Sequence, residues 1–176
     1  ALEEAKGAPF PPVAPLFRHH RSELISLMMS EGKKVLNEAD LEVDEAIDFL
    51  EYYPRSVALL HEDPEVSWSH LGRIAVISPW NFPLAIFIGQ VAAALAAGNC
   101  VIAKPAHQTP LVACQAIKLA YQAGIPKEVL HYLPGSGSLL GAQLMADSRT
   151  AGVAFTGSTI VALGIAKTLL SRSNAP

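Results

Sequence analysis

The residue Asn81 lies in the segment "SPWNFP", directly after the apolar run "GRIAVI". Proline lacks an amide donor and fixes φ, so the two prolines of this segment end the strand that the run predicts. A side-chain amide at this point can donate a hydrogen bond to an oxyanion developing on a substrate carbonyl. Trp80 and Pro83 are rigid neighbours that could hold it in place. An asparagine can also satisfy the amides of its own turn, and the segment alone leaves both interpretations open.

A lysine and two glycines end two further apolar runs. Lys104 in "AKPAHQTP" is followed by proline, so we expect its side chain to be displayed at the rim. There it could bond ribose hydroxyls or balance a phosphate, or simply be solvated. Gly135 and Gly137 in "LPGSG" leave room for an adenine or a ribose. They do not form the GxGxxG pattern of dinucleotide sites, because Gly141 follows Gly137 by four residues rather than three.

The segment "FTGST" combines a glycine with a helix cap. Gly157 permits close approach of the backbone, and Ser158 is a residue type that caps helix N-termini. The first amides of a helix suit a phosphate group. A plain strand-to-helix turn explains the same residues equally well.

These candidates follow strands in a chain that alternates strand and helix from Leu71 onward. Glycines after two of the helical segments, Gly98 and Gly124, are typical helix ends. We therefore predict an α/β fold: a Rossmann-type parallel sheet with helices on both faces, whose ligands bind at the carboxyl ends of the strands. The four repeats are "RIAVIS" with "LAIFIGQVAAALAAG", "CVIAKP" with "PLVACQAIKLAYQAG", "VLHYLPG" with "SLLGAQLMAD", and "GVAFTG" with "STIVALGIAKTLLS".

The region before this alternation is predicted to be helical. Apolar residues recur at helical spacing in "FRHHRSELISLMMSEGKK" and in "EVDEAIDFLEYYPRSVALL". Acidic residues occupy the other face of the second segment, and we expect Glu42 and Glu45 to be solvated there. The domain prediction is an N-terminal helical region with a polar connection over 1–70, and a cofactor-binding region over 71–176.

Composition excludes several classes of protein. The net charge of −3 gives no reason to expect nucleic acid or an anionic membrane as partner. No run reaches the roughly 18 apolar residues of a spanning helix, and no secretory signal is visible. The two cysteines, Cys100 and Cys114, indicate a reducing, cytoplasmic setting; with the six histidines they show no metal-ligand spacing. We expect Cys100 within a strand and Cys114 within a helix, where a cysteine is usually inert.

In order and spacing, the motifs "ISPWNFP", "IAKPAHQTP", "LPGSGSLLG" and "VAFTGST" resemble the NAD(P)-dependent aldehyde dehydrogenase superfamily. The resemblance covers about Leu71 to Leu170, and in detail it is similar to the dehydrogenase part of the proline utilisation A proteins. That part oxidises L-glutamate γ-semialdehyde to L-glutamate. The resemblance implies NAD as cofactor, with NADP possible, a small aldehyde as substrate, and a parent protein that is a homo-oligomer.

The resemblance also implies roles for individual residues. Asn81 would donate its amide to the oxyanion of the thiohemiacetal. Glu45 of "EAIDF" would reach the ammonium group of the substrate, and Phe82 would pack on its aliphatic part. The cofactor-binding residues implied by the family motifs are Ile77, Trp80 along the nicotinamide pocket, Lys104 on the adenosine ribose, His107, Gly135, Gly157, and Ser158 at the pyrophosphate.

The sequence departs from the family pattern at several points. His107 stands where the family commonly has a glutamate that accepts both ribose hydroxyls, and histidine does not repel a 2′-phosphate. Ile160 stands where a glutamate is usual. The nucleophilic cysteine and the base glutamate of the family have no counterpart here, so we expect a fragment that is inactive alone. The alternatives are an aldehyde dehydrogenase for another substrate, or a non-catalytic dinucleotide-binding homologue.

Overall fold

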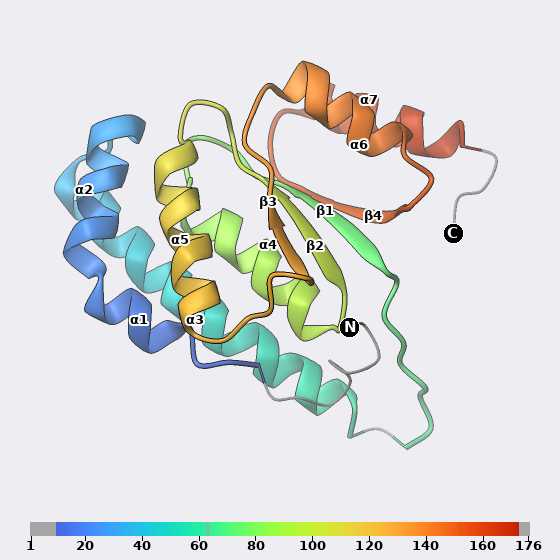
Figure 1. Ribbon diagram of the computed structural model, residues 1–176, viewed down its shortest axis with the longest axis horizontal. Helices are drawn as coiled ribbons and strands as arrows, with labels where there is room; N and C mark the ends of the chain where they lie inside the picture. Colours follow the sequence, from blue (N-terminus) through green and yellow to red (C-terminus); the bar gives the residue numbers. More distant parts are fainter. Residues whose placement is uncertain (1–9, 63, 173–176) are drawn as a thin grey trace.

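The computed structural model describes residues 10–62 and 64–172, so the predicted regions 1–70 and 71–176 extend into residues outside this description. In the described part, four parallel strands form one sheet in the order β3-β2-β1-β4 (Figure 1). The strands are β1 (Arg73–Ile77), β2 (Cys100–Lys104), β3 (Leu130–Tyr132) and β4 (Thr150–Phe155). The strand order reverses beside β1, as in doubly wound α/β folds. The predicted parallel α/β architecture is confirmed.

Helices cover both faces of the sheet because both faces of β1 are apolar. Ile74 and Val76 point into the larger core, which contains residues of α4 (Ala85–Ala96) and α5 (Pro110–Gln122). Ala75 and Ile77 point into a smaller core with α6 (Ala142–Ala146) and α7 (Thr159–Leu170). The predicted helix over "SLLGAQLMAD" begins with a π-helical turn over Gly137–Gly141 rather than as a regular α-helix. Gly98 and Gly124 adopt positive φ after α4 and α5, as their positions predicted.

The N-terminal region forms a further helical layer. It consists of α1 (Ala14–His19), α2 (Arg21–Gly32) and α3 (Leu36–Leu60). Helix α3 is longer than the predicted segment, and it buries its apolar stripe against α4. The ring of Phe49 lies so close to Gly89 that a Cβ there would come within 2.6 Å of it. Small residues on α4 therefore allow the two helices to pack closely. None of the described helices is long and apolar enough to cross a membrane.

Two carboxylates of this layer cap helices of the sheet layer. Glu31 of α2 accepts hydrogen bonds from the amides of Leu111 (2.9 Å) and Val112 (2.7 Å) at the start of α5. Glu42 of α3 accepts from the amides of Leu84 (2.8 Å) and Ala85 (3.1 Å) at the start of α4. Helix N-termini carry free amides and a partial positive charge, so both contacts are favourable.

The expectation that Glu42 is solvated was wrong. Glu42 is 2% exposed, although Glu45, one turn later, is exposed as predicted. A buried carboxylate requires a counter-charge and hydrogen-bond donors. Glu42 has both, because the Lys34 ammonium lies 2.5 Å from its second oxygen.

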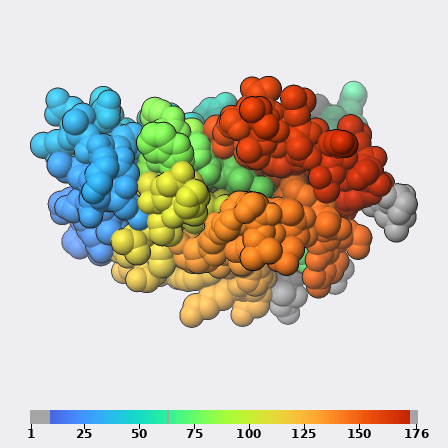
Figure 2. All heavy atoms as spheres, turned by 90° about the horizontal axis from the view of Figure 1, so that it is seen from above, coloured from blue at the N-terminus to red at the C-terminus, as the bar shows by residue number. Residues whose placement is uncertain are grey.

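The carboxyl ends of three strands are level with one another. Ile77 is in register with Lys104 of β2 and with Phe155 of β4. The amide of Thr156 donates to the Ile77 carbonyl over 3.0 Å, which continues the pairing past the strand. The residues that follow β1, β2 and β4 are thus brought to one edge of the sheet. Figure 2 shows the helical layer in blue and the orange-to-red C-terminal elements at opposite ends of the molecule, with the green and yellow segments between them.

Candidate active site at the carboxyl edge of the sheet

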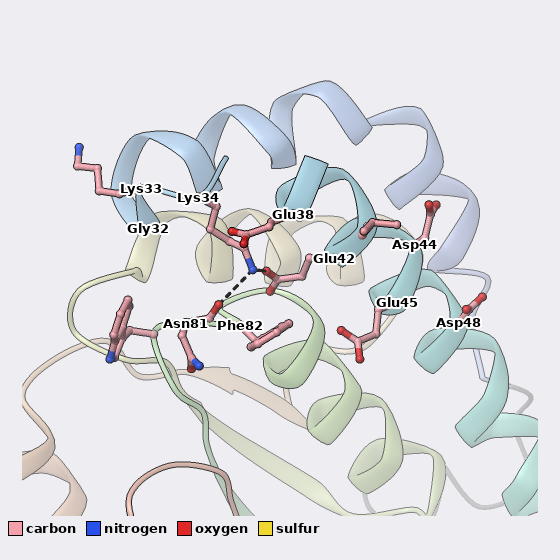
Figure 3. Close-up of a pocket in the computed structure, with 12 residues that line it drawn as sticks. Gly32, Lys33, Lys34, Glu38, Glu42, Asp44, Glu45, Asp48, Asn81 and Phe82 are labelled. Atoms are coloured by element: carbon pink, nitrogen blue, oxygen red, sulfur yellow. Dashed lines mark hydrogen bonds and ion pairs between the residues drawn. The ribbon is translucent and has the colours of Figure 1, made fainter. Parts of the chain in front are cut away.

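Three residues of the loop after β1 line an open pocket of about 770 Å³ between this loop and α3, and Figure 3 labels two of them, Asn81 and Phe82. Trp80, Asn81 and Phe82 are all exposed, whereas Ser78 and Pro83 at the ends of the loop are buried. Trp80 is 54% exposed, whereas Pro83, the other neighbour expected to hold Asn81 in place, is buried.

The side-chain amide of Asn81 is available to a ligand. Within the described part of the chain, no protein group forms a hydrogen bond with it, and only the Asn81 backbone carbonyl accepts one. An asparagine that stabilised its own turn would use its side chain for that purpose. The geometry therefore favours the interpretation of Asn81 as a donor to a bound molecule over the interpretation as a turn residue.

Lys34 is a pocket residue that sequence reasoning missed. Its ammonium donates to the Asn81 carbonyl over 3.1 Å and to Glu42, and it lies 4.3 Å from the centre of the Phe82 ring. Lys33 and Lys34 follow each other at the end of a helix, where lysines are usually solvated, so the sequence did not indicate that Lys34 lines a pocket. The left-handed backbone of Lys33, with φ of 55°, separates the two side chains. Figure 3 shows Lys33 pointing away from the pocket and Lys34 pointing into it.

The α3 side of the pocket is acidic. Glu45 is exposed in the same pocket as Phe82, as the two assigned roles require. Three more carboxylates line the pocket and are exposed: Glu38, Asp44 and Asp48. Asp44 is committed to Arg21, which holds the pKa of the Asp44 carboxyl below its usual value. The remaining acidic side chains would favour a cationic group in the pocket.

Lys104 is not displayed at the rim as expected. It is 4% exposed, and its ammonium donates to the carbonyls of Pro105 (2.8 Å) and Gly135 (3.4 Å). Burial lowers the pKa of this ammonium below its ordinary value. An ammonium has three donors, so one remains after these two contacts. These two carbonyls compensate for the burial of the Lys104 ammonium, and no sequence pattern predicted that contact.

The glycines after β3 lie beside Lys104. Gly135 has φ of +146°, and a Cβ there would come within 2.5 Å of Leu140. A Cβ on Gly137 would lie 3.9 Å from Cε of Lys104. The predicted grouping of Lys104 with these glycines thus exists in the fold.

The turn after β4 contains the predicted helix cap. The hydroxyl of Ser158 accepts from the amide of Val161 over 3.4 Å at the start of α7. Gly157 and Ser158 are exposed, and so is His107 in the turn after β2. Ile77 is buried at the end of β1, with its side chain in the smaller core. None of these four residues lines the 770 Å³ pocket, so the predicted site residues fall into a pocket group and a strand-end group.

Both cysteines lie where the sequence predicted. Cys100 is buried in β2 and Cys114 is half-buried in α5; neither lines the pocket. Burial raises the pKa of the Cys100 thiol, which disfavours its reactive thiolate form.

The fold agrees with comparisons to known proteins. The model of the aldehyde dehydrogenase family matches residues 5–175. This chain belongs to the aldehyde dehydrogenase family. The bifunctional protein PutA of Escherichia coli is 49% identical over 164 residues, which cover 92% of this chain and 12% of that protein. The 1-pyrroline-5-carboxylate dehydrogenase of Bacillus cytotoxicus is 40% identical over 162 residues, which cover 86% of this chain and 32% of that protein.

A solved structure of similar fold is that of 1-pyrroline-5-carboxylate dehydrogenase from Thermus with bound NAD. It has a TM-score of 0.89 and 35% identity, and the match covers 99% of this chain and 37% of that one. This aldehyde dehydrogenase chain therefore spans about a third or less of the length of these relatives.

Proposed function

We propose that this chain is part of an NAD(P)-dependent aldehyde dehydrogenase that oxidises L-glutamate γ-semialdehyde to L-glutamate, and that Asn81 stabilises the oxyanion of that reaction. The observation that carries the proposal is the exposed Asn81 side chain, which belongs to a residue that lines the pocket and has no hydrogen-bond partner among the described residues. Family membership and the relatives PutA and 1-pyrroline-5-carboxylate dehydrogenase support it.

The substrate assignment rests on the two walls of the pocket. The Phe82 ring offers an apolar surface to the methylene groups of an amino-acid aldehyde. Glu45 offers a carboxylate to its ammonium group, in a wall that is already acidic. An aldehyde without an ammonium group would gain nothing from Glu45. We therefore expect Glu45 to lower the KM for the amino-acid aldehyde and to leave the KM for aldehydes without an ammonium group unchanged.

Asn81 supplies the interaction that strengthens during the reaction. Attack by a thiolate places negative charge on the carbonyl oxygen, and a fixed amide donor stabilises that charge more than it stabilises the free aldehyde. Since Cys100 and Cys114 both lie away from the pocket, we assign the thiolate to a part of the protein outside these 176 residues.

The strand-end group fits a dinucleotide. Lys104 retains one ammonium donor for a ribose hydroxyl, next to the exposed backbone of Gly137. The N-terminus of α7, with Ser158 as its cap, offers free amides and a positive dipole end to a pyrophosphate. When bound, the nicotinamide of NAD(P) accepts the hydride from the substrate carbon. His107 carries no negative charge to repel a 2′-phosphate, so this proposal includes NADP.

The test is aldehyde-dependent formation of reduced nicotinamide by the whole protein that contains this chain. Asn81→Ala is expected to lower kcat by about 100- to 1000-fold, the loss typical of one oxyanion donor. Asn37→Ala is the matched control, because Asn37 is exposed on α3 outside the pocket, and it should leave kcat unchanged.

The outcomes separate the proposal from its alternatives. Unchanged kcat in Asn81→Ala would refute the assignment of Asn81. Glu45→Gln with an unchanged KM for L-glutamate γ-semialdehyde would point to another aldehyde. Dinucleotide binding without turnover of any aldehyde would indicate a non-catalytic homologue.

A further inference from the structure

We propose that Lys34 is a positioning residue that sets the orientation of Asn81, and that Glu42 holds Lys34 for this task. The inference rests on the proposed function, since it assigns a role within the same oxyanion site. It concerns Lys34, between α2 and α3, and Glu42 of α3.

The Asn81 side chain cannot orient itself, because no described residue bonds its amide. Its direction therefore depends on where the backbone of the loop lies. Among the described residues, the hydrogen bond from Lys34 to the Asn81 carbonyl is the only side-chain hydrogen bond to the backbone of Trp80–Pro83. An exposed loop that carries a catalytic donor requires such a restraint, since a misplacement of about 1 Å can cost about 100-fold in rate.

Lys34 is itself fixed by its surroundings. Its side chain is 9% exposed, and the ammonium contacts the Asn81 carbonyl, the Glu42 carboxylate and the Phe82 ring. The three contacts together restrict the rotamers that this side chain can adopt. A buried lysine that forms an ion pair, a hydrogen bond and a ring contact at once is a rigid support for the loop.

Glu42 connects the same support to the helix that follows the loop. One carboxylate oxygen accepts a hydrogen bond from the Lys34 ammonium, and the other accepts hydrogen bonds from the amides of Leu84 and Ala85. The loop is thereby held at Asn81 by Lys34 and at the start of α4 by Glu42. Figure 3 shows the Lys34 ammonium between the Asn81 carbonyl and the Glu42 carboxylate. Displacement of either side chain would move the loop backbone relative to the pocket.

The experiment compares lysine variants in the whole protein that contains this chain. Lys34→Met keeps the length of the side chain and removes the ammonium. Lys33→Met is the matched control, since Lys33 is the adjacent residue, is exposed and, among the described residues, donates only to the Ser30 carbonyl. We expect Lys34→Met to lower kcat by about 10- to 100-fold with KM changed less than the rate, and Lys33→Met to change neither.

A second variant covers the case in which Lys34→Met fails to fold because Glu42 is left buried without a counter-charge. The double variant Lys34→Met/Glu42→Gln removes both charges and keeps an oxygen that accepts the amides at the start of α4. It should fold and show the same loss of kcat. A lower thermal midpoint with an unchanged kcat in this variant would overturn the proposal, because it would mean that the pair only stabilises the fold.

A comparison in the Asn81→Ala background tests whether the effect acts through Asn81. If Lys34 acts by orienting the amide, adding Lys34→Met to Asn81→Ala should lower kcat little further, because the amide is already absent. A kcat reduced by the product of the two single-variant losses would refute the inference. If Asn81→Ala itself leaves kcat unchanged, the proposed function fails instead, so the two failures are distinguishable.

Discussion

Glu31 and Glu42, the two carboxylates of the helical layer that cap α5 and α4, should differ in their contribution to the free energy of unfolding. Glu42 and Glu31 each accept two backbone amides at a helix start, over 2.7 to 3.1 Å. Only Glu42 is also 2% exposed and paired with a buried lysine. Substitution of each glutamate by alanine therefore removes the same cap in two different environments.

The expected magnitudes follow from that difference. Glu31→Ala removes a half-buried cap that is not part of an ion pair with a buried lysine, a change that typically costs about 1 kcal/mol. Glu42→Ala removes one partner of a buried ion pair and leaves the Lys34 charge uncompensated, which typically costs about 3–5 kcal/mol. The free energies of unfolding should thus differ by about 2–4 kcal/mol between the two variants.

Urea denaturation measures this difference, with the free energy of unfolding obtained by linear extrapolation. Glu42→Gln should fall between the native protein and Glu42→Ala, because it retains an acceptor for the amides and loses the charge. Equal losses in Glu31→Ala and Glu42→Ala would contradict the reasoning. Burial and the ion pair would then add nothing beyond the cap.

Three further predictions concern the strand ends. Burial lowers the pKa of Lys104 below its ordinary value of 10.5, so the unfolded chain binds this proton more tightly than the folded chain does. The stability of the native protein relative to Lys104→Met should therefore rise with pH between the lowered pKa and 10.5, and stay level below that window, in urea titrations at each pH. Gly135→Ala should lower the free energy of unfolding by about 1–3 kcal/mol, because Gly135 has a positive φ and a Cβ there would contact Leu140. Gly164→Ala, at a position on α7 where a Cβ meets open space, should raise it by up to about 1 kcal/mol, and thermal denaturation compares the two variants. His107→Glu should weaken NADP binding relative to NAD in a fluorescence titration, since a carboxylate would repel the 2′-phosphate, and an unchanged ratio of the two affinities would remove His107 from the cofactor site.

The order of elements could be predicted because its signals are local. An apolar run of five residues, a proline and a helix-ending glycine act on their immediate neighbours in the chain. The strands β1, β2, β3 and β4 and the helices between them accordingly lie where the alternation predicted them. The π-helical turn over Gly137–Gly141 was not predicted, since the local pattern there suits any helix.

The candidate site could be predicted only in part. The strand-end position of Asn81 and of Lys104 followed from the alternation, and the exposure of Asn81 agrees with it. The surroundings of each residue did not follow. The Lys104 ammonium donates to the carbonyl of the adjacent Pro105 and to that of Gly135, which lies 31 residues further along the chain. Glu42 accepts from amides that lie 42 and 43 residues further along the chain.

The sequence by itself thus determined the α/β class, the order of the elements and the identity of the polar residues at the strand ends. These depend on the backbone preferences and apolar spacing of neighbouring residues. Only the tertiary structure decided the strand order, the burial of Glu42 and Lys104, and the contact between Lys34 and the Asn81 carbonyl. The physical reason is that the protonation, solvation and rigidity of a polar group depend on partners brought to it from distant segments, and no local pattern specifies those partners.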